Sequence, residues 1–376
     1  MNPSQVNRDR KHYMTSATRK SLSPLNRTGN FLTLLALVTP FILPLIVCGG
    51  VAASEEAENS STFIFYFEND LFGNTDEYYT SAFKLSWISK CLADSGTRGG
   101  PLEWLRWFTA KMPAADRKDL FHTIALSLGQ SIYTPKNIET AQLLENDRPY
   151  AGWSYLAAAL QTKNFDFLNT LELNVGIVGP SSLAEQVQKI THKWLGDTEP
   201  QGWDNQINDE LGLMIAWQRF WRVASRSAGH GLAYDVIPHA GITVGNVLTY
   251  ANAGGKIRFG YNLPADFGSS LIGPGGGTVA PVSAQDPRLG AASHFGVTIF
   301  AGVDGRAVAR NIFLDGNTFR DSASVDKNYL VADISAGVSV IFKRFKITYT
   351  QVYRTEEFRE QEGGQFFGSF NLAYTF

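Results

Sequence analysis

The sequence FFGSFNLAYTF at residues 366–376 alternates between two kinds of side chain. One set of alternate positions is mostly apolar and aromatic, and it consists of Phe366, Gly368, Phe370, Leu372, Tyr374 and Phe376. The other set is mostly small and polar, and it consists of Phe367, Ser369, Asn371, Ala373 and Thr375. A period of two residues is typical of a β-strand, whose successive side chains point to opposite faces. The stretch has about the length that a tilted strand needs to cross a bilayer.

This strand also resembles a signal found in bacterial outer-membrane barrels. Phe376 is its last residue, and Tyr374 and Leu372 lie on the same face. Such barrels are recognised for assembly by a C-terminal strand of this kind, so we expect the barrel-assembly machinery to be a partner through the Phe376 strand. A strand of a soluble sandwich could alternate in the same way, but the leader described below favours the membrane.

Segments of similar length and pattern recur along the chain. They lie at residues 62–70, 78–89, 121–133, 153–163, 168–178, 209–223, 231–246, 249–262, 329–342, 343–354 and 366–376. A further stretch at 293–314 contains Asp304-Gly305, which could be a hairpin turn between two strands. Because bacterial single-chain barrels have even strand numbers, we expect one long strand there. The predicted fold is all-β, a 12-stranded antiparallel transmembrane β-barrel.

The composition excludes other classes of protein. A chain of 376 residues with a formal charge of −2 lacks the basic excess of nucleic-acid-binding proteins, so no nucleic-acid partner is expected. Its mean hydropathy of −0.12 suits a barrel in which half of each strand faces a polar lumen. Trp87, Trp153 and Tyr374 lie near strand ends, and we expect them to form aromatic girdles at the membrane interfaces.

The first 53 residues are predicted to be a secretory signal peptide, which leaves residues 54–376 as the outer-membrane barrel domain. Basic residues dominate the start of this leader, and an uncharged apolar run from Phe31 to Val47 follows. Small residues then lead to Ala53, after which we expect cleavage.

Two alternatives to a cleaved leader are a single membrane anchor and a lipoprotein modified at Cys48. Two prolines in the apolar run fit an anchor poorly, and a bulky valine before Cys48 fits a lipoprotein poorly. Translation could also begin at Met14. Removal of the leader takes the formal charge to −7 and leaves Cys91 as the only cysteine, so an intramolecular disulfide is excluded.

Residues 181–196, SSLAEQVQKITHKWLG, have the period of one short amphipathic helix in an outer loop. The apolar stripe consists of Leu183, Val187, Ile190 and Trp194. We expect Ser181 or Ser182 to cap the start of this helix and Gly196 to end it. Because the helix lies between two barrel strands, its stripe must pack against either the barrel rim or the lipid surface.

Oxygen-rich side chains gather at the turn between the first two predicted strands. They belong to Phe67-Glu68-Asn69-Asp70 and to Asn74-Thr75-Asp76-Glu77-Tyr78-Tyr79-Thr80. Carboxylate and amide oxygens suit a hard cation such as Ca²⁺, although the spacing is not that of an EF-hand loop. A solvated polar turn is the alternative. Thr80 has the strand parity of Lys84 and Ser86, so we expect it to face the lumen.

Gln188 and His192 are one helical turn apart, so they lie together beside the apolar stripe. Histidine is suited to act as a general base near neutral pH, although an exposed helical histidine can also be merely solvated. The other histidines after the leader show no metal-ligand spacing; they are His122, His230, His239 and His294. The absence of a Gly-x-Ser-x-Gly motif gives a serine nucleophile no support.

A third polar group lies in the segments 129–135 and 147–153, where Asp147 and Arg148 could form an ion pair with a turn. Taken in order, the motifs are similar to those of the lipid A 3′-O-deacylase family of outer-membrane barrels. They are Glu68-Asn69-Asp70, Tyr79-Thr80, Tyr133-Thr134-Pro135, Asp147-Arg148, Gly176-Ile177-Val178-Gly179-Pro180, the helix with Gln188 and His192, and Trp203-Asp204-Asn205-Gln206-Ile207. The resemblance covers essentially the whole chain after the leader and is strongest between residues 66 and 210.

The resemblance implies a 12-stranded barrel that uses Ca²⁺ to remove the 3′-acyloxyacyl group of lipid A. It also implies a site between the barrel wall and a helix from an outer loop. On this sequence the family's site falls on Asn69, Asp70, Thr80, Gln188 and His192. Catalytic roles are implied for His192, Gln188, Asn69 and Thr80, and Asp70 and Asn69 are the implied Ca²⁺ ligands.

Two positions depart from the family pattern. The family uses a lysine before Asp-Arg, and here only Lys136 is available, at a shifted position. An acidic residue is expected just after the helix, where this chain has Thr198 between Asp197 and Glu199. Both departures concern contacts with the substrate headgroup more than the hydrolytic centre.

The expected function is Ca²⁺-assisted hydrolysis of the 3′-linked ester of lipid A by a water molecule that His192 activates. We expect the site to lie at the extracellular rim of a barrel in the outer membrane. The expected partners are lipid A or lipopolysaccharide and the surrounding bilayer. Two alternatives are an outer-membrane phospholipase and a non-catalytic pore or binding barrel.

Overall fold

The computed structural model describes residues 60–70, 78–92, 120–276, 279–283, 285–289 and 294–376. The strand segments are β1 (Thr62–Asn69), β2 (Tyr78–Ile88), β3 (Phe121–Thr134), β4 (Ala151–Lys163), β5 (Phe167–Val178), β6 (Glu210–Trp221), β7 (Ala224–Gly229), β8 (Leu232–Gly245), β9 (Leu248–Tyr261), β10 (Phe295–Asn311), β11 (Leu330–Phe342), β12 (Phe345–Arg354) and β13 (Gln365–Thr375). The helical segments are η3 (Pro180–Ser182), α4 (Ala184–Leu195), η4 (Trp203–Asn205) and α5 (Ile312–Asp315). The predicted signal peptide lies outside the described residues.

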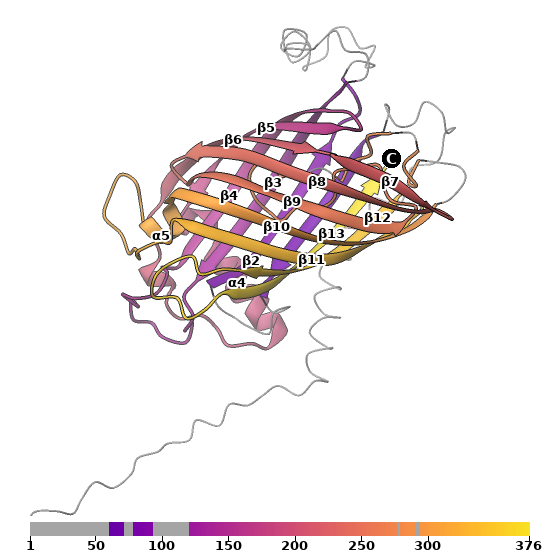
Figure 1. Cartoon of the computed structure of the whole chain (residues 1–376). Helices are drawn as coiled ribbons and strands as arrows, with labels where there is room; N and C mark the ends of the chain where they lie inside the picture. Colours follow the sequence, from indigo (N-terminus) through magenta and orange to yellow (C-terminus); the bar gives the residue numbers. More distant parts are fainter. Residues whose placement is uncertain (1–59, 71–77, 93–119, 277–278, 284, 290–293) are drawn as a thin grey trace, which may run out of the picture. The chain divides into compact units, whose positions relative to one another are not determined.

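The strands close into an antiparallel barrel (Figure 1). Strands that follow one another in sequence pair, except that β6 and β7 do not pair with each other; β1 also pairs with β13, and β6 with β8. β6 and β7 both pair with β8, one after the other, so they are two parts of a single strand interrupted at Arg222 and Val223. The barrel therefore has 12 strands, and the predicted fold class is confirmed.

The long stretch around Asp304-Gly305 is one strand, as strand parity predicts. Within β10, Gly305 pairs with Ala253 on one side and Ala332 on the other, so no turn occurs there. The sequence pattern misses the β7 extension. Its six residues, ASRSAG, carry no large apolar side chain that would mark a face.

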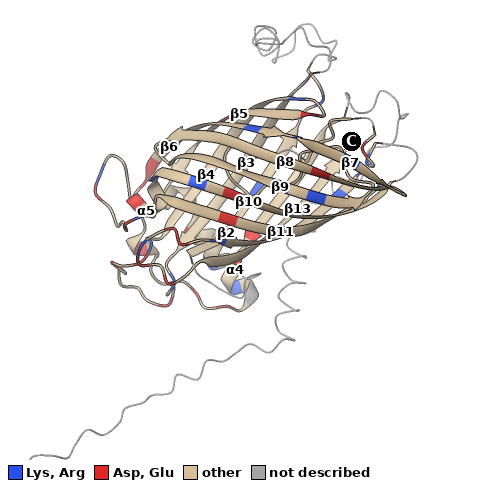
Figure 2. Ribbon diagram, in the orientation of Figure 1, with Lys and Arg blue, Asp and Glu red and all other residues tan. Residues whose placement is uncertain are grey.

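The two faces of the wall differ as the alternation predicts. On β13 the side chains of Phe367 and Thr375 are buried, whereas Phe366 and Phe376 on the other face are exposed. Figure 2 shows mostly neutral strands, with charged residues in short patches and in the loops. The prediction that Trp153 belongs to an aromatic girdle is wrong. Its side chain points inward, and its ring stacks on that of Tyr155 with centroids 5.5 Å apart. No described helix is both long and apolar enough to cross a bilayer.

The connection between β9 and β10 folds back into the lumen. We call the described residues of 263–289 the plug. Near the start of the plug, Phe267 packs with Leu168 and Phe220 of the wall. Further along, Leu271 and Ile272 pack against an inner cluster around Tyr79. The plug therefore fills much of the length of the barrel interior.

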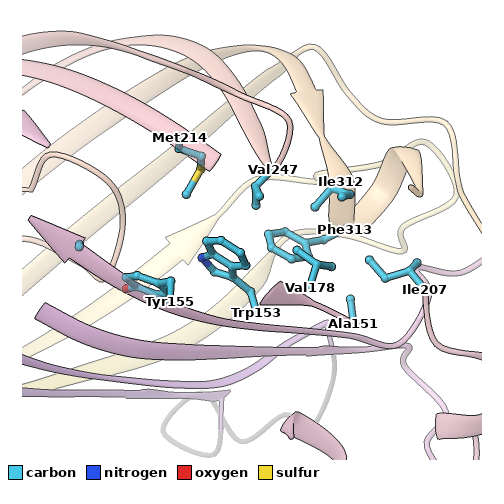
Figure 3. Packing of buried hydrophobic residues seen from close by; sticks show 10 residues of the cluster. Ala151, Trp153, Tyr155, Val178, Ile207, Met214, Val247, Ile312 and Phe313 are labelled. Atoms are coloured by element: carbon cyan, nitrogen blue, oxygen red, sulfur yellow. The ribbon is translucent and has the colours of Figure 1, made fainter. Parts of the chain in front are cut away.

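An apolar cluster packs inside the end of the barrel that carries α5 (Figure 3). Trp153 and Tyr155 of β4 meet Met214 of β6 and Phe313 of α5 in this cluster. The ring of Phe313 stacks on that of Tyr133, with centroids 4.1 Å apart. α5 and α4 lie at the end of the barrel opposite the C-terminus (Figure 1).

Candidate active site

η3 and the start of α4 lie against the outer face of the barrel wall. Even-numbered residues of β3 and β4 point outward, because Leu128 and Leu156 are among the exposed side chains. Gln130 and Ser154 are therefore outer-face residues. Each donates a hydrogen bond of 2.7 Å to the carbonyl oxygen of Ser182, which fixes η3 to the wall.

Gly152 makes this close approach possible. It is an outer-face residue of β4, and a Cβ atom there would lie 2.1 Å from Oγ of Ser182 and 2.3 Å from Cβ of Ala184. Neither distance is sterically allowed. The missing side chain therefore provides the space in which the start of α4 rests on β4.

α4 turns the face with Gln188 and His192 toward the barrel. Three of the four stripe residues point away from it, whereas Val187 is half-buried and packs against the cluster that contains Trp203. Ala184, Gln188 and His192 occupy successive turns and are 1%, 2% and 6% exposed. By contrast, Leu183, Ile190 and Trp194 are 58%, 58% and 62% exposed. The predicted pairing of Gln188 with His192 on one face is confirmed. Of the two alternatives for the stripe, packing against the rim is wrong for these three residues.

The predicted N-terminal cap of the helix is wrong. Ser181 and Ser182 belong to η3, and α4 begins after Leu183, whose φ of 61° is left-handed and which provides no side-chain cap. The backbone N–H and the hydroxyl of Ser181 instead donate to the carboxylate of Asp209, each at 2.7 Å. Gly196, with φ of 69°, ends the helix as predicted.

The segment that follows α4 orients both functional side chains. Nδ1 of His192 lies 2.6 Å from the carbonyl oxygen of Thr198. Because a carbonyl oxygen only accepts, the neutral imidazole carries its proton on Nδ1 and keeps the lone pair on Nε2. The indole N–H of Trp203 donates to Oε1 of Gln188 at 2.8 Å. The buried amide nitrogen of Gln188 has no hydrogen-bond partner among the described residues.

Asn69 lies at one end of a row of residues that crosses four strands on the outer face. It has the parity of the exposed Phe63 on β1. In the sheet register Asn69 pairs with Ser81, Ser81 with Ile132, and Ile132 with Gly152. Strands are about 4.8 Å apart, so the row is roughly 14 Å long. The wall that carries Asn69 and the wall under α4 are therefore one continuous surface.

Thr80 also faces outward, which corrects the prediction that it faces the lumen. The pairing between β2 and β3 shifts by one residue between Tyr79 and Ser81, so Thr80 is the extra residue of a β-bulge. Its hydroxyl lies 2.6 Å from the hydroxyl of Thr134, an even-numbered residue of β3 and therefore on the outer face. The bulge thus moves Thr80 to the side of the wall on which Asn69 lies.

Asp70 follows β1 directly and is fully buried. The neighbouring Asn69 and Thr80 are 5% and 3% exposed, so three oxygen-bearing side chains are sheltered at the ends of β1 and β2. Asp76 and Glu77, which the sequence places in the same group, lie outside the described residues. Within the described ranges, no three His, Cys, Asp or Glu side chains gather as a metal site.

An ion pair joins two loops at the end of the barrel that carries α4. Nη1 of Arg148 lies 3.1 Å from Oε2 of Glu357, and both side chains are buried. Burial alone raises the pKa of Glu357, but Arg148 and Arg354 outweigh it and hold the pKa below its usual value. Lys136, expected from the family pattern to contact substrate, pairs with Glu362 at 2.9 Å on the surface.

A family model described as “Outer membrane protein LpxR” matches residues 36–376. The chain belongs to the LpxR family. Among solved structures, LpxR from Salmonella typhimurium matches with a TM-score of 0.65 and 16% identity, over 83% of this chain and 99% of that chain. The β-domain of the Bordetella autotransporter BrkA matches at a TM-score of 0.42 and 9% identity, over 85% of this chain and 100% of that chain. No curated protein matches the sequence.

Membership of the LpxR family confirms the resemblance that the motifs indicate, and it places the barrel in the outer membrane. At 16% identity, the likeness to the Salmonella LpxR shows the fold alone. The roles of individual residues therefore depend on the geometry of this chain.

Three residues acquire roles that sequence reasoning does not assign. Trp203 orients Gln188, Gly152 makes room for α4, and the hydroxyl of Thr134 contacts Thr80. Trp203 and Thr134 belong to family motifs and Gly152 to the polar segment 147–153, and the sequence gives no other signal for them. At the position after the helix where an acidic residue is expected, the backbone carbonyl of Thr198 contacts His192 instead.

Proposed function

We propose that this protein is an outer-membrane lipid A deacylase that hydrolyses the 3′-linked acyloxyacyl ester at the extracellular rim. The observation that carries the proposal is the burial of Gln188 and His192 between α4 and the outer face of the wall. A lipid can reach that face from the membrane without entering the lumen. A secreted chain inserts from the periplasm with both barrel termini there, which puts the end with α4 outside.

His192 is the proposed general base. Its Nε2 takes a proton from water while the water oxygen attacks the ester carbonyl carbon, and the Thr198 carbonyl stabilises the resulting imidazolium through Nδ1–H. The tetrahedral intermediate then breaks its bond to the sugar oxygen, which receives the proton from Nε2. The products are a free 3′-hydroxyl on the sugar and a carboxylic acid.

Gln188 is the proposed donor to the oxyanion. Because Oε1 of Gln188 already accepts the hydrogen bond from Trp203, the amide N–H groups are the ones that can donate to a ligand. A preoriented donor of this kind stabilises the charge that develops on the carbonyl oxygen, and loss of one such donor costs roughly 10²–10³ in rate. Asn69 and Thr80 on the facing wall are further candidates for contact with the same oxygen.

The residues present fit a Ca²⁺ ion. The fully buried carboxylate of Asp70 and the amide oxygen of Asn69 are hard oxygen donors, which Ca²⁺ prefers. Bound there, Ca²⁺ supplies positive charge that polarises the ester carbonyl. Chelation with EGTA is expected to abolish deacylation without unfolding the barrel, as judged by lipid A mass spectra and heat-modifiable gel mobility. Full activity in EGTA would contradict the proposed metal requirement.

Mass spectrometry of lipid A tests the proposed base. In a Gram-negative host whose lipid A carries the 3′ acyl group, the wild type should remove that group and His192→Asn should not. His294→Asn is the matched control, because His294 is exposed at the far end of the barrel. Both variants should remain heat-modifiable. A fully active His192→Asn variant would exclude His192 as the base.

The plug argues against the pore alternative, because wall and plug side chains pack together inside the barrel. The phospholipase alternative is separated from deacylation by offering glycerophospholipids and lipid A in one extract. The proposed partners are lipopolysaccharide, the bilayer and the barrel-assembly machinery. The position of Phe376 supports the proposed contact with the barrel-assembly machinery. Phe376 lies at one end of the barrel, where its backbone pairs with that of Ser61.

A further inference from the structure

α4 has three faces, and each meets a different environment. The first consists of Ala184, Gln188 and His192 and is buried against the barrel. At about 100° per residue, the other two faces lie on opposite sides of the buried one. One is the exposed apolar stripe, made of Leu183, Ile190 and Trp194. The other is polar and consists of Glu185, Lys189 and Lys193.

The apolar stripe adjoins the lipid-facing surface of the wall. Along the outer face of β4, Gly152 lies under the start of α4, Ser154 holds η3, and the next outward residue, Leu156, is 65% exposed. On β3 the outward residue after Gln130 is Leu128, which is also exposed. On both strands, the first outward residue beyond the contact with η3 therefore already belongs to the apolar surface that faces the membrane.

We propose that the apolar stripe of α4 lies among the acyl chains of the outer leaflet. The polar face, with Lys189 and Lys193, then lies at the level of the anionic headgroups. A helix with an apolar side and a lysine-bearing side is suited to the plane of a membrane interface. Three large apolar side chains are unfavourable when exposed together to water. Contact with acyl chains explains why this stripe is exposed on the protein surface.

This placement would set the depth of the active site, an extension that rests on the proposed function. Because the buried face of α4 lies between its apolar and polar sides, Gln188 and His192 are at the boundary between acyl chains and headgroups. The ester bonds of lipid A lie at the same boundary. α4 would thus hold the hydrolytic face where the scissile bond occurs.

Nitroxide labels can measure the position of the stripe without any assay of activity. Cysteines are introduced singly at Ile190, at Lys189 and at Leu156, with the native cysteines replaced, and the labelled proteins are reconstituted into vesicles of phosphatidylethanolamine and phosphatidylglycerol. Collisions with oxygen report lipid, and collisions with a water-soluble nickel chelate report water. The label at Ile190 should favour oxygen several-fold, as at the lipid-facing Leu156, whereas the label at Lys189 should favour nickel.

Two results would overturn the proposal. Equal nickel access at Ile190 and Lys189 would place the stripe in water. Dipolar broadening between labels at Ile190 would instead assign the stripe to contact with a second copy of the chain. An inactive wild type would refute the proposed function and leave these measurements unaffected.

The depth-setting role has a separate test. Ile190→Glu is expected to lower deacylation of membrane-embedded lipid A at least tenfold while leaving the activity on detergent-dispersed lipid A near that of the wild type. Lys189→Gln, on the polar face, is the matched control and should not distinguish the two substrates. An equal loss on both substrates would show that Ile190 supports the fold of α4 and not its depth.

Discussion

At the scale of single residues, the orientation of the Gln188 amide depends on Trp203. The indole N–H of Trp203 donates a hydrogen bond to Oε1 of Gln188. This bond fixes which end of the amide is the oxygen and which is the nitrogen. Trp203→Phe keeps an aromatic ring in the buried site and removes that donor. A hydrogen bond is worth about 1 kcal/mol, and 1.4 kcal/mol corresponds to tenfold in rate. We therefore expect kcat to fall about fivefold with KM nearly unchanged.

Steady-state kinetics on detergent-dispersed lipid A measure this split. Trp217→Phe is the matched control, because Trp217 is partly exposed on the outer face of β6 and contacts neither functional residue through a described hydrogen bond. A variant with raised KM and unchanged kcat would assign Trp203 to substrate binding. Loss of heat-modifiable mobility would assign it to folding alone.

The sequence predicts some residue positions and not others, for identifiable reasons. Gln188 and His192 are predictable because four residues make one helical turn whatever surrounds it. Thr80 is not, because one extra residue in β2 reverses the parity on which its side depends. Trp203 is 15 residues from Gln188, and only tertiary folding brings its indole to the amide.

At the scale of elements, each strand is predictable because alternation directly reflects a wall with two different faces. The start of α4 is not predictable from local capping rules. Two serines precede the helix, but their polar atoms bond to Asp209 and Gly179 instead of the helix N–H groups. The docking of η3 onto β3 and β4 takes precedence over the local preference of serine for the N-cap.

Gly152 allows a test of that docking. Gly152→Val would place methyl groups where Ser182 and Ala184 now lie, so η3 and α4 should move off the wall. We expect deacylation to fall at least a hundredfold, because the Gln188–His192 face would lose its position against the wall. The folded barrel should persist, since the strand pairs of β4 do not depend on α4.

The control for this substitution is Gly305→Ala. A Cβ atom at position 305 would meet its nearest neighbour at 3.7 Å, an ordinary contact, so activity should be retained. Activity is measured as the remaining 3′ acyl chain in lipid A spectra, and folding as heat-modifiable mobility. Wild-type activity in Gly152→Val would show that the close approach of α4 to β4 is not needed for catalysis.

At the scale of the whole molecule, ion pairs join the plug to the wall. Asp266 of the plug contacts Arg258 of β9 at 2.7 Å and Lys346 of β12 at 2.6 Å. Arg288, at the other end of the plug, contacts the same carboxylate at 2.9 Å. The sequence shows this segment only as a long connection rich in glycine and proline, because its charged partners lie on distant strands.

Electrical recordings in planar bilayers test whether this centre keeps the lumen closed. The wild type is expected to show no channel steps, because the plug packs against the wall inside the barrel. Asp266→Asn would leave Lys346 without a carboxylate partner among the described ion pairs, whereas Arg258 keeps Asp235 and Arg288 keeps Asp286. Removal of one partner from a buried ion pair typically costs about 3–5 kcal/mol, and this loss would weaken the attachment of the plug to the wall. The variant should therefore conduct and should lose heat-modifiable mobility at a lower temperature.

Asp321→Asn is the matched control, because Asp321 lies in an exposed loop and the described residues give its side chain no ion pair. It should be as silent as the wild type.

Channel steps in the wild type would contradict a closed lumen. An Asp266→Asn variant as silent and as heat-resistant as the wild type would show that apolar packing of Phe267, Leu271 and Ile272 holds the plug without its charged centre. A conducting variant that still deacylates lipid A would separate the closed lumen from the hydrolytic face on the outer wall, since Gln188 and His192 have no contact with the plug among the described hydrogen bonds.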